Sequence, residues 1–243
     1  LVVSGNIGGN AMVWHFRLGY AVLTLVLFRL LWGAVGGHWS RWTQLPLSPA
    51  RVWAYLRGQG HEGAGHNPLG SWSVLLMLAW LLLQVGTGLV SDDEIANAGP
   101  LSALVSGSTV SLVTAWHKGP GKLVLLALVL VHVGAIVWYR VRRQQALVPA
   151  MLHGDKTLPE ATPASRDSLG TRWLALLLVL GCALAVRWLV GLAAEAARSS
   201  PDRSPHWPTQ LGATLAAGPL AHLNFGHPRD HFVRAANRRG MAG

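Results

Sequence analysis

The stretch Trp14–Val35 reads WHFRLGYAVLTLVLFRLLWGAV, and it decides the class of fold. A helix that crosses a membrane needs about 20 mostly apolar residues, because the hydrocarbon core is about 30 Å thick. This block, extended back to Met12, has that length. It lacks the alternation of apolar and polar residues that marks a membrane-barrel strand. We therefore expect a membrane-spanning α-helix over residues 12–35.

Three further blocks have the same apolar character. They contain SWSVLLMLAWLLLQVGTGLV, KLVLLALVLVHVGAIVWY and WLALLLVLGCALAVRWLVGL, and they cover residues 69–90, 110–139 and 172–193. Each is long enough to cross a bilayer as a helix. The sequence therefore predicts an all-α integral membrane protein with a bundle of at least four spans.

The composition of the 243 residues excludes several other classes. Charged residues make up 12% and hydrophobic residues 51%, whereas soluble domains average about 25% charged residues. A disordered chain is excluded, and an ordinary soluble enzyme is disfavoured. The single cysteine, Cys182, excludes an internal disulfide, a Cys-ligated cluster and covalent c-type haem attachment. No H-E-x-x-H or Gly-rich nucleotide loop occurs, and we predict no catalytic residue and no nucleic-acid partner.

The loops between the spans differ in charge. The loop between the second and third spans holds Asp92, Asp93 and Glu94 and no Lys or Arg. The other two loops are basic, with Arg41, Arg51 and Arg57 in residues 37–67 and Arg140, Arg142, Arg143, Lys156, Arg166 and Arg172 in residues 140–172. Because Lys and Arg mark the cytoplasmic side, we expect the acidic loop outside. The net charge of +10 suits loops beside anionic lipid.

The two ends of the chain lie outside the four predicted spans and are interpreted separately. The opening LVVSGNIGGN looks like the outer end of an earlier apolar helix that this sequence lacks. We expect a haem-binding membrane domain over residues 1–155, a cytoplasmic linker over 156–171, one additional span over 172–193 and a basic tail over 194–243. We assign the tail no function.

Ionisable side chains within a span are costly and usually mark a functional site. Three histidines meet this criterion: His15 in the first span, and His117 and His132 in the third. On an α-helix His132 lies about 22 Å beyond His117 and roughly 60° around the axis, so both point to one broad face. His15 and His117 both begin spans that run inward, so we expect them to face each other at one depth.

Haem suits this arrangement better than a bare metal ion, because a haem iron takes one imidazole from each of two helices. Gly19 and Gly121 each follow one of these histidines by four residues, which leaves room for a flat macrocycle on the same helix face. Arg17 and Arg29 are candidates for pairing with haem propionates, with snorkelling to the interface as the alternative. Each histidine also has a simpler interpretation as a packing or interfacial residue.

Several segments, taken in order, resemble the prokaryotic cytochrome b561 family, and in particular the cytochrome b subunits associated with Ni,Fe-hydrogenases. They are WHFRLGYAVLTLVLFRLLWG (14–33), GHNPLGSW (65–72), GPLSALVS (99–106), the helix from His117 to His132, and VHVGAIVWY (131–139). The resemblance covers about residues 1–155. It implies four helices that hold two b-type haems, each between two histidines.

The resemblance assigns ligand roles by position. It makes His15 and His117 ligands of an outer haem and His132 a ligand of an inner haem. The family's fourth ligand lies on a first helix that this sequence lacks, which leaves one or two haems for this chain. His66, at the cytoplasmic start of the second span, is the one nearby candidate to replace it. A role at a helix start or beside a quinone is the alternative for His66.

The resemblance also implies a function. The chain would carry electrons in the bacterial inner membrane between the quinone pool and a periplasmic redox partner. That partner would be a hydrogenase, another oxidoreductase or a c-type cytochrome, and the chain would be an electron-transfer subunit of a respiratory complex rather than a stand-alone enzyme. The alternative class is a non-redox membrane scaffold or small transporter with structural histidines.

Overall fold

The structure, a computed structural model, describes residues 1–9, 11–59, 65–142, 144, 148–149 and 168–199. The linker predicted over residues 156–171 lies mostly outside this part, and so does nearly all of the basic tail. Residues Leu1–Ser199 form one compact unit. Within the described residues the regular structure is helical, and an isolated bridge between Asp92 and Ala98 is the only β pairing.

Four helical segments are long and apolar enough to cross a membrane, which confirms the predicted class of fold. They are α2 (Ala11–Val35), α4 (Pro68–Val90), the composite span Gly107–Arg142, and residues 169–192 of α8 (Leu169–Ser199). The predicted limits agree with these within three residues. Leucines such as Leu112 (73% exposed) and Leu130 (72% exposed) point away from the bundle, as expected where the surroundings are lipid.

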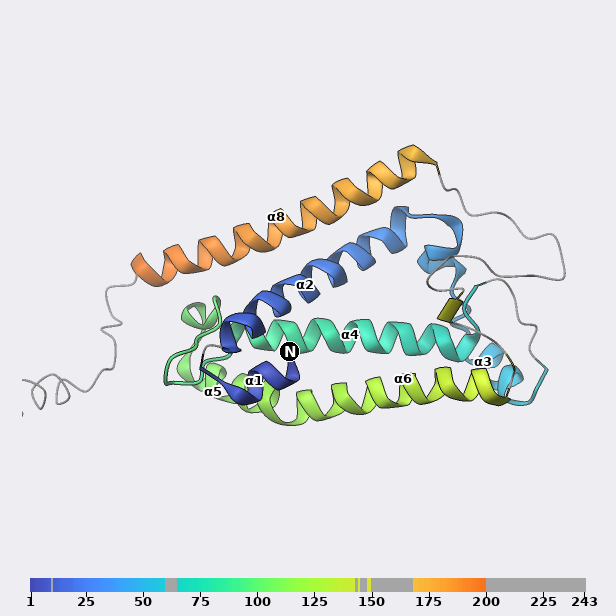
Figure 1. Cartoon of the computed structure of the whole chain (residues 1–243), viewed down its shortest axis with the longest axis horizontal. Helices are drawn as coiled ribbons and strands as arrows, with labels where there is room; N and C mark the ends of the chain where they lie inside the picture. The colour runs from blue at the N-terminus through green and yellow to red at the C-terminus, as the bar shows by residue number, and fades with distance from the viewer. Residues whose placement is uncertain (10, 60–64, 143, 145–147, 150–167, 200–243) are drawn as a thin grey trace, which may run out of the picture. The chain divides into compact units, whose positions relative to one another are not determined.

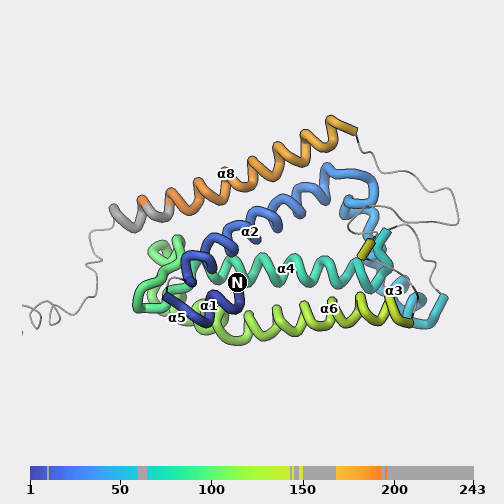
Figure 2. The backbone as a smooth tube through the Cα atoms, in the orientation of Figure 1, coloured from blue at the N-terminus to red at the C-terminus, as the bar shows by residue number. Residues whose placement is uncertain are grey.

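The spans pack side by side in the order α8, α2, α4 and α6 (Lys122–Arg142), as Figures 1 and 2 show. The small buried core lies where the first three meet, and it contains Leu23 of α2, Leu89 of α4 and Val186 of α8. A short first helix, α1 (Val2–Ile7), packs on the start of α2. Lys122 of α6 also reaches α1, because its Nζ donates to Asn6 Oδ1 (3.2 Å).

The third span is not one continuous α-helix. It consists of α5 (Gly107–Trp116), a π turn (η4, His117–Gly121) and α6 (Lys122–Arg142). Pro120 has no backbone N–H, and Gly119 has a non-helical conformation (φ −105°, ψ −107°), so the regular hydrogen-bond ladder is interrupted here. The continuous α-helix assumed for His117 and His132 is therefore wrong at this turn.

Helix caps and short helices complete the two ends of the bundle. Asn67 caps α4 by accepting from the N–H of Gly70 (2.6 Å), and Ser106 caps α5 through Thr109 (3.3 Å). After α2 the chain forms two 3₁₀ turns, His38–Ser40 and Trp42–Gln44, and then α3 (Pro49–Leu56). A further 3₁₀ turn, Ser102–Leu104, precedes α5.

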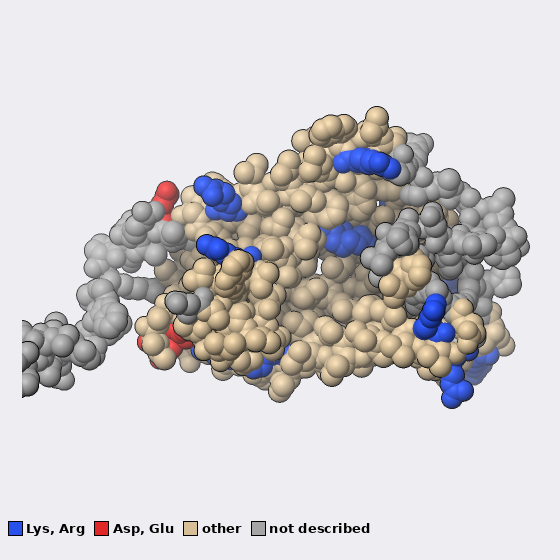
Figure 3. All heavy atoms as spheres, viewed as in Figure 1, with Lys and Arg blue, Asp and Glu red and all other residues tan. Residues whose placement is uncertain are grey.

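The two ends of the bundle differ in their acidic residues. We call the end with Asp92, Asp93 and Glu94 the acidic end, and the end with α3 and the last turn of α6 the basic end. Figure 3 shows Asp and Glu atoms only on the left of the molecule, whereas Lys and Arg atoms lie on both sides, with one group at the lower right. This separation agrees with the charge pattern that the sequence analysis used to orient the spans.

Candidate haem site

His15 and His117 meet at the acidic end of the bundle. His15 lies in the first two turns of α2, and His117 begins the π turn that follows α5. Their ring centroids are 6.1 Å apart and their planes are nearly perpendicular, at 89°. The structure thus brings together the two histidines that the sequence places at equal depth.

Each of these imidazoles is held by a backbone carbonyl at Nδ1. The Nδ1 atom of His15 lies 3.0 Å from the carbonyl oxygen of Leu1, and that of His117 lies 2.9 Å from the carbonyl oxygen of Gln84. A carbonyl oxygen only accepts, so each Nδ1 carries the proton in these bonds. Each Nε2 then presents a lone pair, which is the tautomer a metal-ligating histidine needs.

The spacing of the two rings fits a single iron between them. A metal bound at about 2 Å by one nitrogen from each ring requires ring centres about 6 Å apart, and the observed separation is 6.1 Å. Within the described residues there is no group of three or more His, Cys, Asp or Glu side chains that could hold a metal ion. Two neighbouring imidazoles without further protein ligands suit a haem, which would supply the other nitrogen ligands itself.

Three glycines shape the space around the rings. A Cβ at Gly88 would lie 2.8 Å from Cε1 of His117, and one at Gly5 would lie 2.9 Å from Nδ1 of His15. Only glycine leaves room for the imidazoles at these two positions. A Cβ at Gly19 would meet nothing within 4 Å, so this helix face has free space beside His15.

Polar residues of α4 hold the π turn in place. Gln84 Nε2 donates to the carbonyl oxygen of His117 (2.9 Å), and Trp80 Nε1 donates to that of Gly121 (3.0 Å). Thr87 Oγ1 lies 3.2 Å from Nδ1 of His117 and donates to the same Gln84 carbonyl (2.9 Å). The kink frees backbone carbonyls, and the α4 side chains satisfy them.

Gly121 does not have the α-helical relation to His117 that its spacing suggested. The two residues are joined by a π turn, so the i, i+4 geometry does not apply. Gly121 is buried, and a Cβ there would collide with Gln84 Oε1 and lie 2.9 Å from Trp116 Nε1. In the structure this glycine permits the close approach of α4.

His132 and His66 are not brought together with another histidine. His132 lies half-buried in α6, and within the described part of the chain it makes no hydrogen bond or aromatic contact. His66 lies just before α4, where desolvation and then the positive charge of Arg29 lower its pKa. This environment favours a neutral imidazole but supplies no second ligand.

Arg17 and Arg29 make different contacts. Arg17 is exposed, with its guanidinium 5.4 Å from the ring centroid of Trp14, and it remains near the His15 end of α2. Arg29 reaches the other way, donating to the carbonyl of Ser40 (3.2 Å) and lying 4.4 Å from the ring centroid of Trp42. This is the snorkelling arrangement.

The acidic loop is organised around its own carboxylates. Asp93 Oδ1 accepts hydrogen bonds of 2.8–3.0 Å from the three backbone N–H groups of residues 95–97, and its Oδ2 accepts from Asn97 Nδ2 (2.7 Å). Desolvation opposes the charged form, but these hydrogen bonds outweigh it and hold the pKa of Asp93 well below its usual range.

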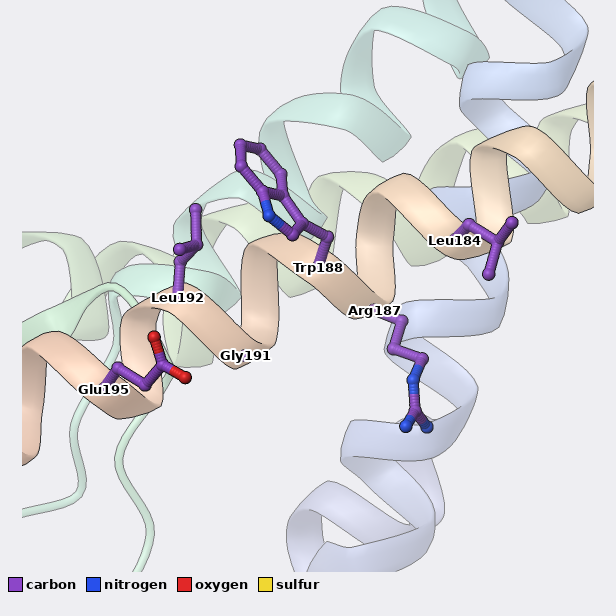
Figure 4. A pocket seen from close by; sticks show the side chains of 6 residues that line it. All are labelled: Leu184, Arg187, Trp188, Gly191, Leu192 and Glu195. Atoms are coloured by element: carbon purple, nitrogen blue, oxygen red, sulfur yellow. The ribbon is translucent and has the colours of Figure 1, made fainter.

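A shallow depression elsewhere on the surface is distinct from the histidine pair. Its six lining residues all belong to α8, and Figure 4 shows Trp188 and Arg187 pointing in different directions from this helix. It has no histidine, and one helix alone does not enclose a haem. The lining residues are Leu184, Arg187, Trp188, Gly191, Leu192 and Glu195.

Four residues of the histidine site were not predicted from the sequence: Gly5, Gln84, Thr87 and Gly88. Gly88 lies against the ring of His117. Gln84 and Thr87 could have been identified from the sequence as candidate site residues, because both are polar within the apolar span Pro68–Val90.

These observations define a multi-pass membrane protein whose bundle presents two imidazoles suited to one haem. Comparison with known families then identifies it. The family model of prokaryotic cytochrome b561 matches residues 2–154. The chain belongs to this family, which consists of b-type, haem-binding cytochromes, and α8 lies beyond the matched region.

Curated relatives agree with this assignment. The chain is 25% identical over 165 residues to a protein of Cupriavidus necator named "Probable Ni/Fe-hydrogenase B-type cytochrome subunit", with 60% of this chain and 67% of the relative covered. Proteins of the same name from Bradyrhizobium diazoefficiens (26% over 164 residues) and Rhizobium leguminosarum bv. viciae (24% over 160 residues) match 58% of this chain. The match spans 64% and 66% of their own lengths. No solved structure matches the chain significantly.

Proposed function

We propose that this protein carries electrons through b-type haem between a periplasmic redox partner and the quinone pool of a bacterial inner membrane. The observation that carries the proposal is the pairing of His15 and His117, with ring centroids 6.1 Å apart and both Nδ1 atoms bonded to backbone carbonyls. A packing histidine has no need of a second imidazole at this spacing.

In this proposal the chain's own residues fix the ligands. His15 and His117 would hold the outer haem through Nε2, and Gly19 would leave space for the macrocycle edge. The haem supplies reversible one-electron chemistry at its iron. The carbonyls of Leu1 and Gln84 hold each ring in one tautomer, and hydrogen bonding at Nδ1 raises the basicity of the ligand. Arg17 is the candidate to pair with a propionate.

A second, inner haem is part of the proposal only through His132. His66 is the one candidate to face it, and the structure joins neither to another histidine. In this proposal one haem is held by His15 and His117, and a second haem would need His132 together with a further ligand, for which His66 remains the candidate. The proposed redox partner is inferred from the curated relatives, which are named as probable subunits of Ni/Fe-hydrogenases.

The deciding experiment is a reduced-minus-oxidised spectrum with haem quantitation on the purified, detergent-solubilised chain. We expect a b-type spectrum. His15→Ala and His117→Ala should each remove the same haem, identified by its potential, while His38→Ala, which alters a histidine outside the spans, should leave it in place. Variants that lose different haems would refute the pairing. A folded protein that takes up no haem would instead favour the scaffold or transporter class.

A further inference from the structure

Helix α3 is too short to cross a membrane and lies between the spans α2 and α4. Its eight residues, Pro49–Leu56, follow the basic loop after α2. One side of α3 is fixed to the bundle through Tyr55, which is buried. The opposite side is exposed and carries Trp53 (58% exposed) and Leu56 (59% exposed).

The hydrogen bonds of α3 set its depth. The hydroxyls of Tyr55 and Tyr139 are 2.5 Å apart, and Asn67 Nδ2 donates to the Tyr139 hydroxyl (2.8 Å). Tyr139 lies in the last turn of α6, and Asn67 is the N-cap of α4. Since both positions are the ends of spans, α3 is held at the level where the chain leaves the hydrocarbon core.

Arginines flank the exposed apolar side chains. The guanidinium of Arg57 lies 4.7 Å from the ring centroid of Trp53, and Arg51 is exposed two residues before that tryptophan. Arg140 and Arg142 are exposed on the same turn of α6 as Tyr139. Residues 36–59, 65–90 and 122–142 contain no Asp or Glu, so the described residues around α3 carry only positive charge.

We propose that α3 is an interfacial helix that binds anionic phospholipid headgroups of the cytoplasmic leaflet. Trp53 and Leu56 would enter the boundary between headgroups and acyl chains, and Arg51 and Arg57 would bind lipid phosphates. The stacked guanidinium of Arg57 keeps its N–H edges available for phosphate oxygens. Charge and depth together favour lipid over a soluble acidic protein.

The test uses spin labels on the full chain in lipid nanodiscs. Leu56→Cys is labelled in a Cys182→Ser background, and Ile95→Cys, 85% exposed in the acidic loop, is the matched control. In discs of phosphatidylcholine with phosphatidylglycerol, the label at residue 56 should be more accessible to oxygen than to a water-soluble nickel chelate. The label at residue 95 should show the reverse. A label at residue 56 as open to the chelate as the control would overturn the proposal.

A second measurement separates lipid charge from simple burial. Native mass spectrometry of the protein from mixed discs should show retained phosphatidylglycerol, with Arg57→Gln lowering its ratio to phosphatidylcholine about fivefold and Arg57→Lys retaining most of it. An unchanged ratio in Arg57→Gln would refute headgroup binding. Dipolar broadening between labels at residue 56 would show that a second copy covers this face instead.

Discussion

The acidic end of this bundle brings two histidines together, whereas the two candidate histidines nearer the basic end stay apart. At the acidic end, His15 and His117 lie with ring centroids 6.1 Å apart, and backbone carbonyls hold both rings. His132, in the middle of α6, and His66, at the basic end, have no histidine partner among the described residues, and the polar contacts of the basic end join Tyr55, Tyr139 and Asn67. The difference lies in whether a second helix supplies a partner at the same depth.

The largest expected effect separates the two histidines of the third span. His117→Ala should abolish haem binding at the acidic end, because under the proposed function it would remove one of the two histidines that hold the haem. His132→Ala should leave that haem unchanged in amount and spectrum. Haem quantitation on both purified variants checks this, and loss of the acidic-end haem in His132→Ala would contradict the assignment.

The next effect concerns free space beside the histidines. Gly19→Leu should displace the haem at the acidic end, because the new side chain fills the open face next to His15. Gly134 is a matched control, since it also has nothing within 4 Å and lies two residues from His132. Gly134→Leu should keep the haem content of the natural chain. If Gly19→Leu also keeps its haem, that face does not receive the macrocycle.

Polar side-chain contacts at the two ends of the bundle should affect different properties: haem affinity and stability at the acidic end, and stability alone at the basic end. Gln84→Leu leaves the carbonyl of His117 without its side-chain donor, which should cost about 1–3 kcal/mol of stability and lower haem affinity. Tyr139→Phe breaks the contacts to Tyr55 and Asn67 and should cost about 1 kcal/mol without changing haem affinity. Thermal unfolding and haem titration measure the two effects. Equal haem affinity in both variants would remove Gln84 from the site.

The smallest effect is the pH dependence of the acidic loop. Because the folded pKa of Asp93 is depressed, its carboxylate stabilises the loop fully above the unfolded pKa of about 3.9. That contribution is lost as the pH falls through the lower folded pKa. Limited proteolysis should show the loop opening in strong acid, with Asp93→Ala already more susceptible at neutral pH. Equal susceptibility at neutral pH would show that the carboxylate contributes nothing; solvent screening keeps the effect modest.

Much of this protein could be predicted from sequence, because lipid is a simple solvent. Long apolar blocks identified four spans within three residues of their limits, and the regular rise of a helix placed His15 and His117 at one depth. The π turn at His117–Gly121 was beyond this approach. The lysine, proline and glycines of KGPG did not reveal whether the helix would stop, kink or form a wider turn.

The sequence alone determined the membrane class, the charge difference between the ends and the pair of histidines, since these follow from hydropathy and from distance along an axis. Only the tertiary structure decided which groups surround that pair. Several groups contact the histidines from neighbouring segments. They are the backbone carbonyls of Leu1 and Gln84, the side-chain amide of Gln84, and Gly88, which has no side chain to collide with the ring of His117. Their positions depend on how α1 and α4 rotate and approach, and helix periodicity within one segment carries no information about that rotation.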